Sequence, residues 1–108
     1  MMRNMAGMMK KVQEMQSRME ELQVEMARTE FTAAVGGDSV TVTVTGKGEM
    51  RNVRINPAAV DAADIGMLED MVVLATNNAR AEADRTMAAR MKDINGELPL
   101  PPGMSLPF

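Results

Sequence analysis

The feature that most constrains this chain is an apolar stripe through its first 26 residues. Large apolar side chains recur there at alternating spacings of three and four, so that from Met5 to Met26 the average spacing is 21/6, or 3.5 residues. This is the heptad value of paired helices. The members of the stripe are Met5, Met8, Val12, Met15, Met19, Leu22 and Met26. The stripe predicts a helix over about residues 3–29, about 40 Å long at ~1.5 Å per residue. A chain of 108 residues is too small to cover that length, so we expect a seam with another helix, within the subunit or in a second copy.

The period changes to two after residue 30. Phe31, Ala33 and Val35 alternate with small or polar neighbours, and a Gly-Gly-Asp turn at 36–38 precedes a strict valine/threonine alternation at 40–45. A turn at 46–48 leads to a third segment, 49–55, which stops at the following Asn-Pro. We therefore predict a three-stranded antiparallel meander over about 30–56. The valines should face a core and the threonines the other side.

A second long helix is predicted over about residues 62–94, with Asp61 or Asp64 as its N-cap. Its apolar stripe averages 26/7, or about 3.7 residues, and consists of Leu68, Val72, Ala75, Ala79, Ala83, Met87, Met91 and Ile94. The three alanines would let another backbone approach closely. Residues 97–108 hold four of the five prolines, which predicts an extended tail. Residues 1–96 thus read as one α+β domain of order α-β-β-β-α.

Composition removes several classes of function. The chain has no Cys, His, Trp or Tyr, so disulfides, Cys/His zinc sites and thiol or histidine catalysis are excluded. Adjacent carboxylates such as Glu20 and Glu21 point about 100° apart on a helix, so they do not converge on one site. We therefore expect no enzyme activity, cofactor, metal or small-molecule substrate. No stretch approaches the ~20 apolar residues of a membrane span. We expect a cytoplasmic protein.

Charge is unevenly distributed. Residues 1–19 carry four positive charges and one negative, and residues 20–30 carry one and four. Residues 61–76 carry four negative charges, whereas 77–92 carry four positive and two negative. If both helices leave the same edge of the sheet, the two basic segments are their free ends and lie near each other. The predicted contacts to double-stranded DNA are Arg3, Lys10, Lys11, Arg18, Arg85, Arg90 and Lys92.

The alternative is that these charges only solvate the surface. Dipole compensation accounts for cations near the end of the second helix but not near the start of the first. A weaker basic group, Lys47, Arg51 and Arg54, lies on the predicted strand hairpin as a possible secondary DNA contact or simply a solvent face. With no aromatic residue in the basic segments and a sheet between the helices, base stacking and a helix-turn-helix are not expected.

Several segments together resemble the YbaB/EbfC family of small bacterial nucleoid-associated proteins. Besides the Met-rich heptads, they are Gly36-Gly37, Val40-x-Val42-x-Val44-x-Gly46-x-Gly48-Glu49, Val53-x-Ile55-x-Pro57, and Met67-Leu68-Glu69-Asp70-Met71-Val72-Val73 leading to Asn77 and Asn78. The resemblance implies a homodimer with a central sheet built from both subunits and paired projecting helices. It also implies DNA binding in the nucleoid, with effects on nucleoid organisation or gene expression.

Two hypotheses about function follow. The first is a dimeric nucleoid protein that recognises DNA mainly by backbone and shape, with affinity that falls steeply as salt rises. The second is a coiled-coil adaptor or small chaperone that grips other proteins through its Met-rich helices. The second predicts binding that ignores salt and depends on methionines rather than on lysines and arginines.

Overall fold

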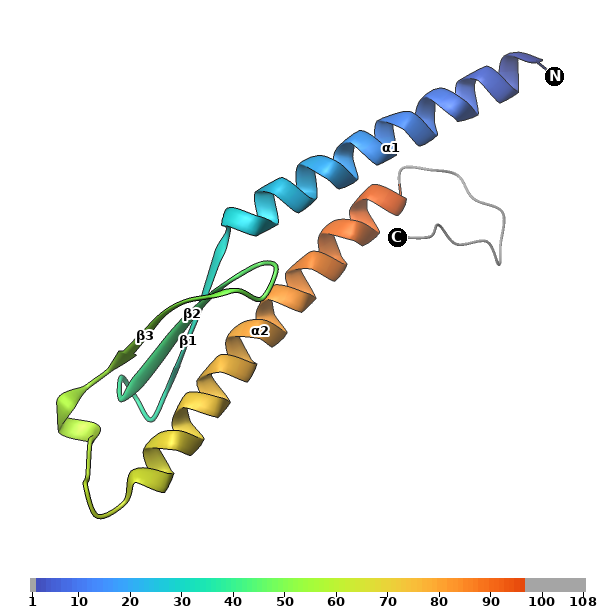
Figure 1. Ribbon diagram of the computed structural model, residues 1–108. Coiled ribbons are helices and arrows are strands. Elements are labelled where there is room, and N and C mark those ends of the chain that lie inside the picture. The colour runs from blue at the N-terminus through green and yellow to red at the C-terminus, as the bar shows by residue number, and fades with distance from the viewer. Residues whose placement is uncertain (1, 97–108) are drawn as a thin grey trace.

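The computed structural model describes the backbone of residues 2–96 and the side chains from Met5 onward. The predicted Pro-rich tail at 97–108 lies outside the described residues. The elements are α1 (Met2–Arg28), β1 (Glu30–Val35), β2 (Val40–Thr45), β3 (Met50–Ile55), the 3-10 turn η1 (Pro57–Ala59) and α2 (Ile65–Asn95). This order confirms the predicted α-β-β-β-α fold (Figure 1).

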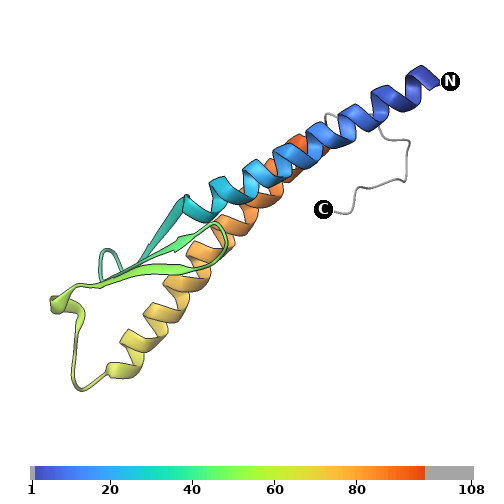
Figure 2. The ribbon, with the colours of Figure 1, turned by 45° about the horizontal axis from the view of Figure 1, so that its top comes forward.

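The molecule is a rod with the sheet at one end, and its principal extents are 73 × 26 × 17 Å. α2 runs along one face of the sheet, passes its edge and continues beside the second half of α1 (Figures 1 and 2). α1 leaves the same edge of the sheet and extends well past the end of α2. We call this projecting pair of helices the arm.

The sheet has the order β1-β2-β3 and is antiparallel throughout. The valines of β2 are fully buried, and the alanines of α2 pack against them: Val40, Val42, Val44, Ala75, Ala79 and Ala83. Cβ methyl groups let the helix lie close to the strands, as the alanine stripe predicted. On the opposite face Thr32 and Thr43 are directly paired, and their hydroxyls are 2.9 Å apart.

Thr45 is an exception to the predicted alternation, because it is 1% exposed. Its Oγ1 accepts hydrogen bonds from the backbone N–H of Lys47 (3.3 Å) and of Glu49 (3.2 Å). The threonine therefore holds the β2–β3 turn together from the inside. Alternation alone could not predict this.

The end of α1 is joined to that same turn. The backbone N–H of Gly46 donates to the carbonyls of Met26 (2.8 Å) and Thr29 (3.0 Å). A Cβ at Gly46 would stand 2.6 Å from the Met26 carbonyl oxygen, so only glycine fits there. This joint fixes where the arm leaves the sheet.

Several element boundaries differ slightly from the predictions. α2 begins at Ile65 because Asp64, rather than Asp61, is the N-cap, and its carboxylate accepts from the N–H of Met67 at 3.3 Å. Asp61 instead accepts from the N–H of Ala63 at 2.9 Å in the preceding turn. β3 starts at Met50 rather than residue 49, and η1 was not predicted.

The heptad seam of α1 divides into two halves. Met15, Leu22 and Met26 are buried and Met19 is partly buried, and Leu22 and Met26 belong to the same core as the alanines of α2. The other three members, Met5, Met8 and Val12, are exposed beyond the end of α2. The half of the seam nearer the sheet, at Leu22 and Met26, is therefore a contact within the chain. The half nearer the N-terminus, residues 5–12, is left exposed by the described residues.

Candidate nucleic-acid interface

The predicted DNA-contacting cations lie along the arm. Lys10, Lys11 and Arg18 are exposed on α1, and Arg85, Arg90 and Lys92 are exposed on α2. Arg3 falls within α1, but its side chain lies outside the described residues. The cations thus follow the arm as a series and do not form one compact cluster.

Arg90 forms an ion pair between the two helices of the arm. Its Nη1 and Nη2 donate to Oε1 (3.1 Å) and Oε2 (2.8 Å) of Glu25 on α1. This bidentate geometry is the strongest form of a guanidinium–carboxylate contact. The hydrogen bonds, and then the opposite charge, lower the pKa of Glu25 and raise the pKa of Arg90. Both groups stay ionised at neutral pH.

This ion pair shows how the helices are staggered. Lys10 lies fifteen residues before Glu25, or about 22 Å farther along the axis of α1. Arg85 lies about 7 Å from Arg90 in the other direction, toward the sheet. The basic segment of α2 therefore lies beside the acidic second half of α1, which corrects the expectation that the two basic segments meet. The physical reason is that the first part of α2 covers the sheet, so only its last turns reach the arm.

Arg18 and Arg90 are the predicted cations that do come together. They line one depression between the helices, and the carboxylates of Glu21, Glu25 and Asp93 line it too. With two guanidinium groups and three carboxylates, the lining of this depression carries a slight excess of negative charge. The lysines nearer the tip are consequently the stronger candidates for phosphate contact.

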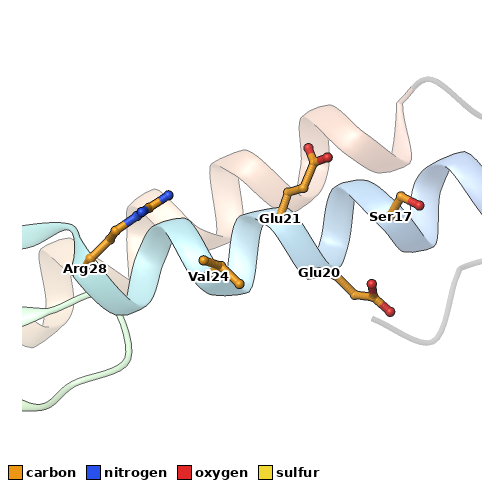
Figure 3. A pocket seen from close by; sticks show the side chains of 5 residues that line it. All are labelled: Ser17, Glu20, Glu21, Val24 and Arg28. Atoms are coloured by element: carbon orange, nitrogen blue, oxygen red, sulfur yellow. The ribbon is translucent and has the colours of Figure 1, made fainter.

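The outer side of α1 over residues 17–28 carries two carboxylates and one guanidinium group. Ser17, Glu20, Glu21, Val24 and Arg28 line an open hollow of about 370 Å³. Figure 3 shows that Glu20 and Glu21 point to different sides of the helix. Divergent carboxylates cannot act as an acid–base pair, and they repel a DNA backbone from this part of α1.

The secondary basic group gains a member that the sequence analysis missed. Lys47 lies in the β2–β3 turn and Arg54 on β3, both exposed, while Arg51 lies 3.8 Å from the Glu49 carboxylate. Arg80 of α2 reaches this turn, and its Nε donates to the carbonyl oxygen of Gly48 at 3.3 Å. The sequence signal for Arg80 was its position in the basic segment 77–92, which did not link it to the β2–β3 turn.

The described part of the chain contains neither a cluster of metal ligands nor a membrane-spanning helix. Between residues 2 and 96, no group of three or more acidic side chains is arranged to hold a metal ion. No helix in the described part of the chain is long and apolar enough to cross a membrane.

These features define a class: an α+β protein whose two helices form an arm with a cationic tip. The chain belongs to the YbaB/EbfC DNA-binding family, whose sequence model matches residues 1–98. It is 45% identical to a nucleoid-associated protein of Agrobacterium fabrum and 41% identical to one of Rhizobium meliloti. Both alignments span 107 residues, 99% of this chain and all of the relative. The family is a DNA-binding family rather than an enzyme family.

A solved structure shows the same fold. An uncharacterized protein of Helicobacter pylori, HP0035, superposes with a TM-score of 0.67 at 18% identity, covering 77% of this chain and 87% of that one. At this identity the likeness concerns the fold alone.

Proposed function

We propose that the protein is a homodimer that binds double-stranded DNA mainly through its phosphate backbone and shape, and so affects nucleoid organisation or gene expression. The observation that carries the proposal is the tip of α1, where Lys10 and Lys11 are exposed beyond the end of α2. The proposed contacts are Arg3, Lys10, Lys11, Arg18, Arg85, Arg90 and Lys92, with Lys47, Arg51 and Arg54 as secondary contacts. Arg90 differs from the rest because it also holds Glu25.

The chemistry of the arm favours backbone contact over base reading. Lysine and arginine side chains on an exposed helix reach phosphates without any fixed geometry. Phe31, the aromatic residue in the described part of the chain, is buried in the core and cannot stack on a base. Affinity should therefore depend strongly on salt and weakly on sequence.

The test is a DNA titration at several salt concentrations with two charge-matched variants. Lys10→Gln with Lys11→Gln removes two positive charges from the tip. Gln13→Glu with Gln16→Glu changes the net charge by the same amount on the same helix while keeping both lysines. Each phosphate contact contributes about −0.9 to the slope of log K against log salt. We expect the lysine variant to lose about 1.8 of that slope for each arm engaged, and the control to lose affinity with little change in slope.

Equal slopes for wild type and the lysine variant would remove the tip from the DNA site. A protein that does not bind DNA at low salt would overturn the DNA proposal itself. Binding to apolar peptides that ignores salt would instead support the adaptor or chaperone hypothesis.

The dimer is proposed to form at β3. β1 and β3 are the two edges of the sheet, but Phe31 and Val35 on β1 are each only 9% exposed. The β3 residues on the sheet face that carries Phe31 and Val35 are more exposed: Met50, Val53 and Ile55 are 41%, 37% and 41% exposed. An apolar edge strand with free backbone groups is suited to pairing with an identical strand. Pairing of two β3 strands would extend the sheet across both subunits.

Sedimentation of two neighbouring variants tests this edge. Val53→Asp places a charge on the apolar face of β3, and we expect it to yield monomers. Asn52→Asp places the same charge on the opposite face of the same strand, opposite Thr43, and should leave the dimer intact. An unchanged mass for Val53→Asp in a folded protein would place the dimer contact elsewhere.

A further inference from the structure

The three exposed members of the α1 seam form, together with the neighbouring Met9, an apolar surface at the tip of the arm. Met5, Met8, Met9 and Val12 are 67%, 55%, 63% and 36% exposed, and we call these four residues the tip face. Met5, Met8 and Val12 continue the stripe whose later members Leu22 and Met26 lie in the core with residues of α2. Figures 1 and 2 show α1 running on past the end of α2, so the interior contact stops while the apolar stripe continues. An apolar patch of this kind marks an interaction site.

The tip face and the cations lie on different sides of α1. At about 100° per residue, Met5 and Val12 fall at the centre of the face, with Met8 and Met9 on either side. The same geometry turns Lys10 and Glu14 to the opposite side of the helix, and Lys11 lies at the margin. The tip can therefore be covered on one side by protein while Lys10 on the other side remains open to DNA.

We propose that the tip face pairs with the tip face of a second copy, the two helices running antiparallel. With the two-fold axis between residues 8 and 9, Met5 faces Val12 of the second copy and Met8 faces its Met9. All four side chains are then buried against apolar partners, so the pattern is self-complementary. Antiparallel pairing also offsets the two lysines from those of the second copy by about one helical turn, ~6 Å, whereas parallel pairing would oppose like charges.

The size of the surface determines the strength of the contact. Four side chains per copy are far fewer than the roughly 20–30 residues a side of a standard interface. The pairing is therefore weak in dilute solution and grows where copies are held side by side, as on one DNA molecule. Here the inference rests on the proposed β3 dimer: each dimer carries two tips, so tip pairing joins dimers into an open series.

Sedimentation over a concentration series tests the pairing. Met5→Gln with Met9→Gln makes the tip face polar. It leaves the net charge unchanged, and glutamine has nearly the same helix propensity as methionine. Met67→Gln, at a residue 56% exposed on α2, is the matched control. The mass of wild type and control should rise above the dimer with concentration, whereas the tip variant should stop at the dimer. If β3 does not pair, the wild type should stop at two chains and the tip variant at one, so the two proposals fail differently.

Disulfide trapping gives a second measurement, because the chain has no cysteine of its own. Met8→Cys stands beside the proposed two-fold axis, and Lys10→Cys stands on the other side of the same helix. Under mild oxidation we expect at least tenfold more cross-linked pairs from Met8→Cys. Equal trapping of both, or a wild-type mass that never rises above the level of the tip variant, would overturn the proposal. If a chain ending at Gly96 pairs through its tip while the full chain does not, the occupant is the segment 97–108, and the proposal is wrong about its partner.

Discussion

Replacing Gly46 by alanine tests whether the joint between α1 and the β2–β3 turn holds the arm. The added Cβ would stand 2.6 Å from both the Met26 carbonyl oxygen and its Cε. The methionine terminus can move, but the carbonyl cannot move without breaking the 2.8 Å hydrogen bond from the Gly46 N–H. Overpacking costs about 1–3 kcal/mol, and loss of one backbone hydrogen bond adds about 0.5–1.5 kcal/mol. We therefore expect a loss of roughly 2–4 kcal/mol in the free energy of unfolding.

The same substitution at Gly7 and Gly66 gives the matched control. Both glycines are helical, and a Cβ at either would have no neighbouring atom within 4 Å. Alanine there should stabilise the protein by about 0.5–1 kcal/mol. The assay is urea unfolding followed by far-UV circular dichroism at one fixed protein concentration, since dimerisation adds to apparent stability. If Gly46→Ala is as stable as wild type, the joint is not the tight contact described above.

Three more substitutions address the core, the turn and the ion pair. Leu22→Ala, at a residue 2% exposed between α1 and the core, should cost about 2–5 kcal/mol in urea unfolding; less than 1 kcal/mol would mean that α1 is not anchored there. Thr45→Val leaves two backbone N–H groups without their acceptor and should cost ~1–3 kcal/mol, more than Thr43→Val on the outer face. Glu25→Gln should lower the melting temperature at pH 7. Because Arg90 lowers the pKa of Glu25 below its usual 4.5, this contribution is present above pH 4.5 and disappears as pH falls through the lowered pKa. A gap between wild type and Glu25→Gln that persists at pH 2 would contradict this origin.

The fold could be predicted because each of its elements buries one regular stripe. The period of 3.5 in α1, the alternation in β2 and the alanines of α2 all report which side of an element faces the core. Val42 and Ala79 were therefore placed correctly without knowledge of the tertiary structure. The N-cap was narrowed to two aspartates, and the choice between them depended on the turn that precedes α2.

What the sequence could not predict is the offset between elements. Met8 and Leu22 occupy equivalent heptad positions, yet Met8 is exposed and Leu22 is buried, because only Leu22 lies in the core with residues of α2. Arg90 meets Glu25 across 65 residues and Arg80 meets Gly48 across 32. Such contacts depend on the position of α2 along its axis relative to the sheet and to α1, and no local sequence pattern encodes that position. For the DNA contacts, the sequence supplies the charges but not their neutralisation by the other helix.

The joint at Gly46 makes the first helix a lever. Residue 5 lies about 30 Å from Met26 along the axis, so a tilt of about 5° at the joint would shift the tip by nearly 3 Å. The two hydrogen bonds of the Gly46 N–H, and the absence of a side chain at this residue, therefore determine the position of Lys10 several helical turns away. In the proposed dimer, the distance between the tips of the two arms would depend mainly on the two Gly46 joints. Substitutions at these joints, far from the DNA, would therefore change which duplex geometry fits between the arms.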